Sequence, residues 1–170
     1  MVLEPATPAM IPVAIGRWAV AAPPSRLRTL LGSCVGVVLH DRTLKLGGLA
    51  HVVLPDSRGN VDHPGKYADT AIPALIADLE KLMRGKSNGR LVAKLAGGAS
   101  MFQPGAGAPA SLAARNIGQL NREAVEALLT TLRIPIIARD LGGDGGRNLV
   151  FDPATGLVQI RTPGGGDHAI

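Results

Sequence analysis

The feature that most constrains the fold is a pair of short apolar runs within residues 30–55, LLGSCVGVVLHDRTLKLGGLAHVVLP. The runs cover residues 35–39 and 52–54, and they are built from Val and Leu, which are common in buried strands. Charged residues at 41–42 and glycines at 47–48 separate them. The pattern therefore predicts two neighbouring strands.

Each run begins beside a residue that can carry chemistry. Cys34, the only cysteine of the chain, precedes the first run, and His51 precedes the second. Adjacent strands can bring a thiol and an imidazole together as a thiolate–imidazolium pair, the activated nucleophile of acyl transfer. Gly32 and Ser33 permit a sharp turn that would aim the Cys34 N–H at a substrate carbonyl. The structural alternative is a small buried hydrophobe and a hydrogen-bonded histidine.

A second histidine, His63, lies in the polar loop after residue 55. It is a rival candidate for the base, but the Pro64-Gly65 pair that follows it favours an exposed turn. The loop itself is of the kind that shapes access to a site. We therefore rank His63 below His51.

Two helices and several further strands are predicted outside this stretch. Residues 70–84 have apolar residues at helical spacing, with Thr70 as the expected N-cap, and Asn116 is expected to cap a second helix. The expected buried stripe of the second helix is Leu120, Ala124, Leu128 and Leu132. The other expected strands are 13–20 (interrupted at Gly16), 91–96, 134–138, 149–151 and 157–161.

These elements predict an α/β fold, a single layered α/β sandwich with a mixed sheet or a sheet pair and two main helices. With 170 residues one domain is expected, over residues 11–162, between a flexible lead-in at 1–10 and a flexible tail at 163–170. The segment 103–111, rich in Pro, Gly and Ala, is expected to be a flexible loop.

Composition narrows the function classes. The net charge of +5 is spread along the sequence, and zinc-finger spacing, a Walker loop and an RNA-binding aromatic signature are absent, so we expect no nucleic-acid binding. The glycine-rich stretch 140–147 lacks nucleotide-binding spacing, and we expect no cofactor and no metal. A single cysteine and the lack of an 18-residue apolar run predict a cytoplasmic protein without membrane insertion.

The sequence also resembles the CheD family of chemoreceptor glutamine deamidases. The resemblance runs in the family's order over about residues 14–161, nearly the whole chain. The matching segments are 29–35 (TLLGSCV), 48–55 (GLAHVVLP), 66–69 (KYAD), 96–101 (AGGASM), 116–118 (NIG) and 140–143 (DLGG).

The resemblance implies the α/β sandwich of that family and conversion of glutamine to glutamate on methyl-accepting chemotaxis receptors. It implies Cys34 as nucleophile, His51 as general base and an upstream threonine as third catalytic residue. Thr29 is the candidate, although a spacing one residue longer would place Arg28 there, and a guanidinium cannot accept a hydrogen bond from the ring.

Two other functions stay open. The first is a docking module that binds receptors and a CheC-type phosphatase, with or without catalysis, which the resemblance also implies. The second is a cysteine protease or transglutaminase-like acyl transferase, because all three reactions share the steps up to the thioester.

Overall fold

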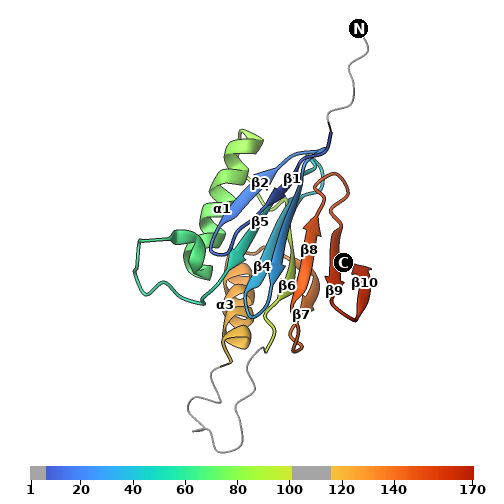
Figure 1. The fold of residues 1–170 in the computed structure, drawn as a ribbon. Helices are drawn as coiled ribbons and strands as arrows, with labels where there is room; N and C mark the ends of the chain where they lie inside the picture. Colours follow the sequence, from blue (N-terminus) through green and yellow to red (C-terminus); the bar gives the residue numbers. More distant parts are fainter. Residues whose placement is uncertain (1–6, 101–115) are drawn as a thin grey trace, which may run out of the picture.

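The computed structural model describes residues 7–100 and 116–170. Two five-stranded mixed sheets lie face to face, and two helices cover the outer face of one of them (Figure 1). The α/β sandwich predicted from the sequence is thereby confirmed. Within the described residues no helix is long and apolar enough to cross a membrane.

Sheet A has the strand order β1-β3-β8-β9-β10 and sheet B the order β2-β5-β4-β6-β7. The strands of sheet A are β1 (Met10–Pro12), β3 (Arg26–Leu31), β8 (Arg147–Phe151), β9 (Val158–Thr162) and β10 (Gly166–Ala169). Those of sheet B are β2 (Trp18–Ala21), β4 (Val35–Asp41), β5 (Leu46–Val52), β6 (Leu91–Gly97) and β7 (Ile136–Leu141). The helices are η1 (Pro64–Lys66), α1 (Ala68–Met83) and α3 (Ile117–Thr131).

The central strand β4 separates two hydrophobic cores. All its residues are buried, and Val35, Val37 and Leu39 face the helices. Val38 points the other way, into the space between the sheets, together with Cys34 just before the strand. This alternation follows from the two-residue period of a strand covered on both faces.

Several predicted elements differ from the structure. Residues 13–20 do not form one strand, because β1 belongs to sheet A and β2 to sheet B, and residues 13–17 cross between them. Thr70 lies inside α1, and its hydroxyl donates to the carbonyl of Pro64. At the C-terminus, Gly166–Ala169 pairs with β9 as β10, where a flexible tail was expected. Met10 of the expected lead-in opens β1, and the expected loop 103–111 lies outside the described residues.

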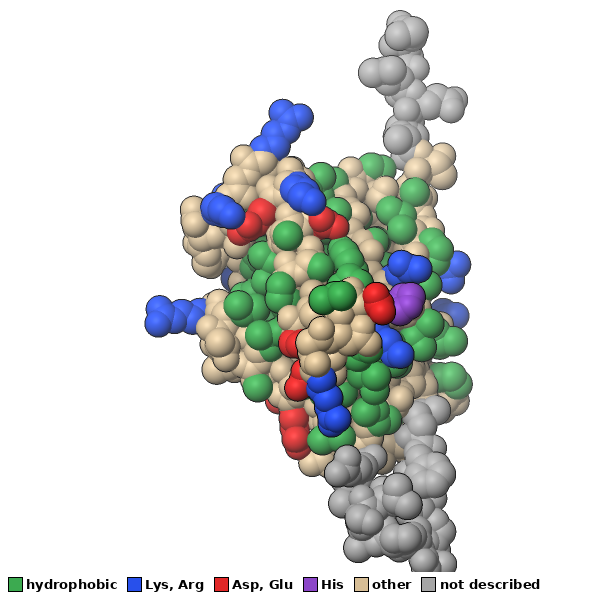
Figure 2. Space-filling view, turned by 90° about the vertical axis from the view of Figure 1, so that its left-hand side faces the viewer, with side chains coloured by type: hydrophobic (Ala, Val, Ile, Leu, Met, Phe, Trp, Pro, Cys, Tyr) green, Lys and Arg blue, Asp and Glu red, His purple; other side chains and the backbone are tan. Residues whose placement is uncertain are grey.

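The buried stripe of α3 differs in part from the predicted one, of which Ala124 and Leu128 do pack against the core. The side that packs on sheet B carries Gly118, Asn121, Val125 and Leu129. Leu120 and Leu132 lie 38% and 39% exposed. Figure 2 shows the helix-bearing side of the molecule, where hydrophobic side chains are interspersed with charged ones. The expected N-cap of this helix is confirmed, because the Asn116 side chain accepts the N–H of Gln119.

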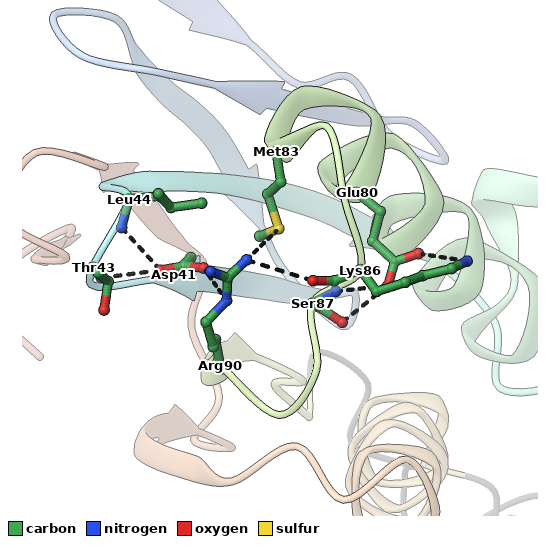
Figure 3. A network of polar contacts seen from close by, with 8 residues as sticks. All are labelled: Asp41, Thr43, Leu44, Glu80, Met83, Lys86, Ser87 and Arg90. Atoms are coloured by element: carbon green, nitrogen blue, oxygen red, sulfur yellow. Dashed lines mark hydrogen bonds and ion pairs between the residues drawn. The ribbon is translucent and has the colours of Figure 1, made fainter.

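A polar network fixes the end of the β4–β5 hairpin that lies away from Cys34 (Figure 3). The fully buried Asp41 carboxylate accepts the backbone N–H groups of Thr43 and Leu44, both at 2.9 Å. Arg90 Nε lies 3.2 Å from the other carboxylate oxygen, and its guanidinium reaches Met83 Sδ and the Lys86 carbonyl. Because a one-residue slip would turn every side chain of a strand over, this anchor helps to keep His51 facing the site.

Candidate active site

Cys34 lies in the connection from β3 in sheet A to β4 in sheet B, with 8% of its surface exposed. Two glycines at the end of β6, Gly97 and Gly98, pack against this connection. Gly98 N–H donates to the Cys34 carbonyl at 2.8 Å, and a Cβ on Gly97 would lie 2.3 Å from that same oxygen. With φ of 98° and 63°, both residues adopt a left-handed backbone that favours glycine.

His51 comes from β5, the strand next to β4, and its side chain is buried at 4% exposure. It pairs with Gly36, two residues after Cys34. Strand periodicity therefore puts the thiol and the imidazole on the same face of sheet B as diagonal neighbours. The strand that carries His51 is not the apolar run 52–54 predicted after it. His51 lies in β5, which begins at Leu46 and ends at Val52.

Thr29 enters the site from the opposite sheet. β3 alternates strictly, so Thr29 faces inward while Arg28 and Leu30 face outward. Thr29 Oγ1 lies 2.7 Å from His51 Nδ1 and 2.7 Å from the Val13 carbonyl. Of the two register alternatives, the structure places Thr29 beside His51, whereas Arg28 lies on the other face of β3.

The two contacts of Thr29 determine the tautomer of the histidine. A carbonyl oxygen can only accept, so the single hydroxyl proton of Thr29 must go to Val13. The Thr29 oxygen then accepts the Nδ1–H of His51, which leaves Nε2 unprotonated. This is the arrangement of a general base whose second nitrogen is held by an orienting group.

Burial sets the protonation of the pair. It lowers the pKa of His51 from 6.5 to about 4, and it raises the pKa of the Cys34 thiol above its ordinary value. Both groups are therefore neutral at pH 7, in contrast to the expected thiolate–imidazolium pair. No hydrogen bond joins the two side chains in the structure, where the His51 ring bonds to Thr29 through Nδ1.

A cavity of about 480 Å³ opens beside this pair. Its lining is Val13, Ala14, Ile15, Thr29, Leu30, Gly32, Ser33, Cys34 and His51. Ile15 and Leu30, at 65% and 64% exposure, form an apolar rim. The backbone N–H groups of Ser33 and Cys34 have no acceptor among the described residues, so they are free to bind a developing oxyanion.

Other candidates lie elsewhere. His63 is exposed in the turn that precedes η1, as its Pro-Gly neighbours indicate, and it does not line the cavity. A larger cavity of about 660 Å³ lies on the outer face of sheet A, where Arg161 pairs with Asp167. It holds no nucleophile. Within the described chain no group of three His, Cys, Asp or Glu could hold a metal.

Sequence reasoning missed one buried contributor, Asn121 on α3. Its amide donates to the carbonyls of Ser33, which precedes Cys34, and Val53, which follows His51 by two residues. The available signal was its place four residues before Val125 and eight before Leu129, on the buried side of the helix.

Comparison with known proteins shows the family of this chain. The family model described as CheD chemotactic sensory transduction matches residues 53–162. A probable chemoreceptor glutamine deamidase CheD from Desulforamulus reducens is 50% identical over 159 residues, covering 92% of each chain. The chemoreceptor glutamine deamidase CheD from Thermotoga maritima is 44% identical over 157 residues, covering 92% of this chain and 94% of its own. A third relative, from Moorella thermoacetica, is 48% identical over 160 residues, covering 92% and 93%. The chain belongs to the CheD family.

Proposed function

We propose that this protein hydrolyses the side-chain amide of glutamines in methyl-accepting chemotaxis receptors, releasing ammonia and leaving glutamate. The contact between Thr29 and His51 carries the proposal, because it leaves Nε2 of His51 free as a base beside Cys34. The receptor substrate is supported by the relatives, whose names describe chemoreceptor glutamine deamidases.

The first half-reaction forms a thioester. His51 Nε2 takes the thiol proton as Cys34 Sγ bonds to the amide carbon, and the oxygen gains negative charge near the N–H groups of Ser33 and Cys34. The intermediate collapses when the carbon–nitrogen bond breaks, and the proton held by His51 leaves with the nitrogen as ammonia.

The second half-reaction restores the enzyme. His51 takes a proton from a water molecule, whose oxygen bonds to the thioester carbon, and the carbon–sulfur bond then breaks. The sulfur regains a proton from His51, and the product is a glutamate side chain. No other reactant is consumed, so water and one amide are sufficient for the cycle.

Incubation with a receptor cytoplasmic fragment, followed by peptide mass spectrometry, tests the reaction. We expect glutamine converted to glutamate, ammonia released and the backbone intact. Backbone cleavage or crosslinks to lysine would instead indicate the protease or transglutaminase-like reaction. Binding without conversion would indicate a docking module, whose partners would include a CheC-type phosphatase.

The apolar rim predicts how the receptor is recognised. Leu30 and Ile15 project beside the cavity that holds Cys34, where they would contact apolar side chains flanking the target glutamine. Leu30→Asp should therefore raise KM for the receptor fragment at least about tenfold, equivalent to about 1.4 kcal/mol, with kcat little changed.

The matched control is Leu157→Asp, since Leu157 is 46% exposed and lines a different cavity, beside Asp152 and Gln159. Steady-state kinetics on the two variants compare the same substitution at two apolar surface positions. Equal KM values for both would show that the rim does not contact the receptor.

A further inference from the structure

Asn121, on α3, hydrogen-bonds to both chain segments that carry Cys34 and His51. It lies on α3 with none of its surface exposed, and its Nδ2 donates to the Ser33 carbonyl at 3.1 Å and to the Val53 carbonyl at 2.9 Å. Ser33 directly precedes Cys34, and Val53 follows His51 by two residues. One amide group therefore links the loop of the nucleophile to the strand of the base.

The orientation of this amide is determined by its partners. Both of them are carbonyl oxygens, which only accept, so the nitrogen must face them. Its Oδ1 is buried and has no hydrogen-bond partner among the described residues. A buried acceptor left unpaired costs stability, so the residue is not explained by packing alone.

The bond to Ser33 has a consequence for the next N–H group. The Ser33 carbonyl and the Cys34 N–H belong to one planar trans peptide unit, in which they point in opposite directions. Because Asn121 holds the carbonyl on the side of α3, the Cys34 N–H is turned the other way, and this N–H has no acceptor among the described residues.

We propose that Asn121 is a positioning residue that fixes the Ser33–Cys34 peptide so that the Cys34 N–H serves as the oxyanion donor. The proposal rests on the acyl-transfer function proposed above. Loss of one oxyanion donor lowers kcat by about 100- to 1000-fold in other enzymes. A rotated Ser33–Cys34 peptide, whose N–H no longer faces the oxyanion, should therefore also lower kcat.

The experiment compares two reactions of Cys34 in the full-length protein. Acylation by p-nitrophenyl acetate passes through an oxyanion, whereas alkylation by iodoacetamide does not. In Asn121→Leu we expect acylation and receptor deamidation to fall at least about 30-fold, and the alkylation rate at pH 9 to stay within about threefold of wild type. In the same variant, KM for the receptor fragment should stay within about threefold of the wild-type value.

Val125→Ala is the matched control, since Val125 lies one turn further along the same buried face of α3 and packs in the core on the helix side of sheet B. It should lower thermal stability without separating the two rates. If Asn121→Leu does not fold, Asn121→Ser is read in the same way, because its small side chain cannot reach both carbonyls.

Each outcome decides the proposal. Acylation unchanged in the Asn121 variant, or acylation and alkylation reduced together, would overturn it. The ester also separates this proposal from the receptor assignment. A wild-type protein that is acylated normally but leaves receptor glutamines unchanged would refute the proposed function, while the Asn121 comparison would still be decided by the ester.

Discussion

Cys34→Ser is expected to abolish deamidation of receptor glutamine, with a loss of at least about 1000-fold in kcat. His51 is neutral at pH 7 and can take a thiol proton, but a hydroxyl is a far weaker acid and nothing else beside it would ionise it. The variant should bind the receptor fragment with unchanged affinity, since the apolar rim is intact. Conversion measured by mass spectrometry and binding measured by calorimetry check the two halves of this expectation.

The control for this substitution is a change of similar size away from the site. Ala71→Ser alters a buried residue of α1, in the core between the helices and sheet B, and it leaves the thiol in place. It should retain turnover. If Cys34→Ser itself kept full activity, Cys34 would be a structural residue and the thioester mechanism would be wrong.

The placement of Cys34 and His51 near each other could be predicted from sequence because it depends on strand periodicity. Cys34 and His51 flank apolar runs in neighbouring strands, and the two-residue period puts both on one face. The choice between Thr29 and Arg28 could not be made in this way. It depends on which residue of β3 faces sheet B, and that is set by the packing of two sheets.

The remaining misses concern contacts between segments far apart in the chain. Asn121 is 88 residues from Ser33, and nothing in the local pattern of α3 relates the two. Gly166–Ala169 is exposed and polar, so it has no strand pattern of its own, yet β9 offers it a free edge to pair with. Residues 13–17 read as part of a strand, but the chain there passes from one sheet to the other over the site.

Activity should persist to a lower pH than an ordinary histidine base allows. Burial lowers the pKa of His51 to about 4, so the ring stays unprotonated in the free enzyme well below pH 6.5. The value of kcat/KM should therefore be constant from pH 8 to about pH 5.5 and should decline only as the pH approaches 4. A pH–rate profile with the receptor fragment measures this, and an acidic limb centred near pH 6.5 would contradict it.

Folding stability should also depend on the protonation of His51. The unfolded chain binds a proton at His51 near pH 6.5 and the folded protein only near pH 4, so the free energy of unfolding should fall as the pH drops through this window. The loss at pH 4 is at most about 3 kcal/mol. Burial also lowers the pKa of His40, so the contribution of His51 is the difference between wild type and His51→Gln in urea unfolding at each pH.

The same variant distinguishes a general base from a preformed ion pair. Without His51, only thiolate formed by solvent can react, and burial raises the pKa of that thiol. His51→Gln should therefore lower kcat by about 1000-fold at pH 7, and its residual rate should rise with pH where the wild-type rate is flat. Thr29→Ala should give a smaller loss of about tenfold or more, because the ring is still present but its Nδ1–H is no longer held. A His51→Gln rate that stays flat with pH would show that the thiolate forms without the imidazole, and the base would then have to be sought elsewhere.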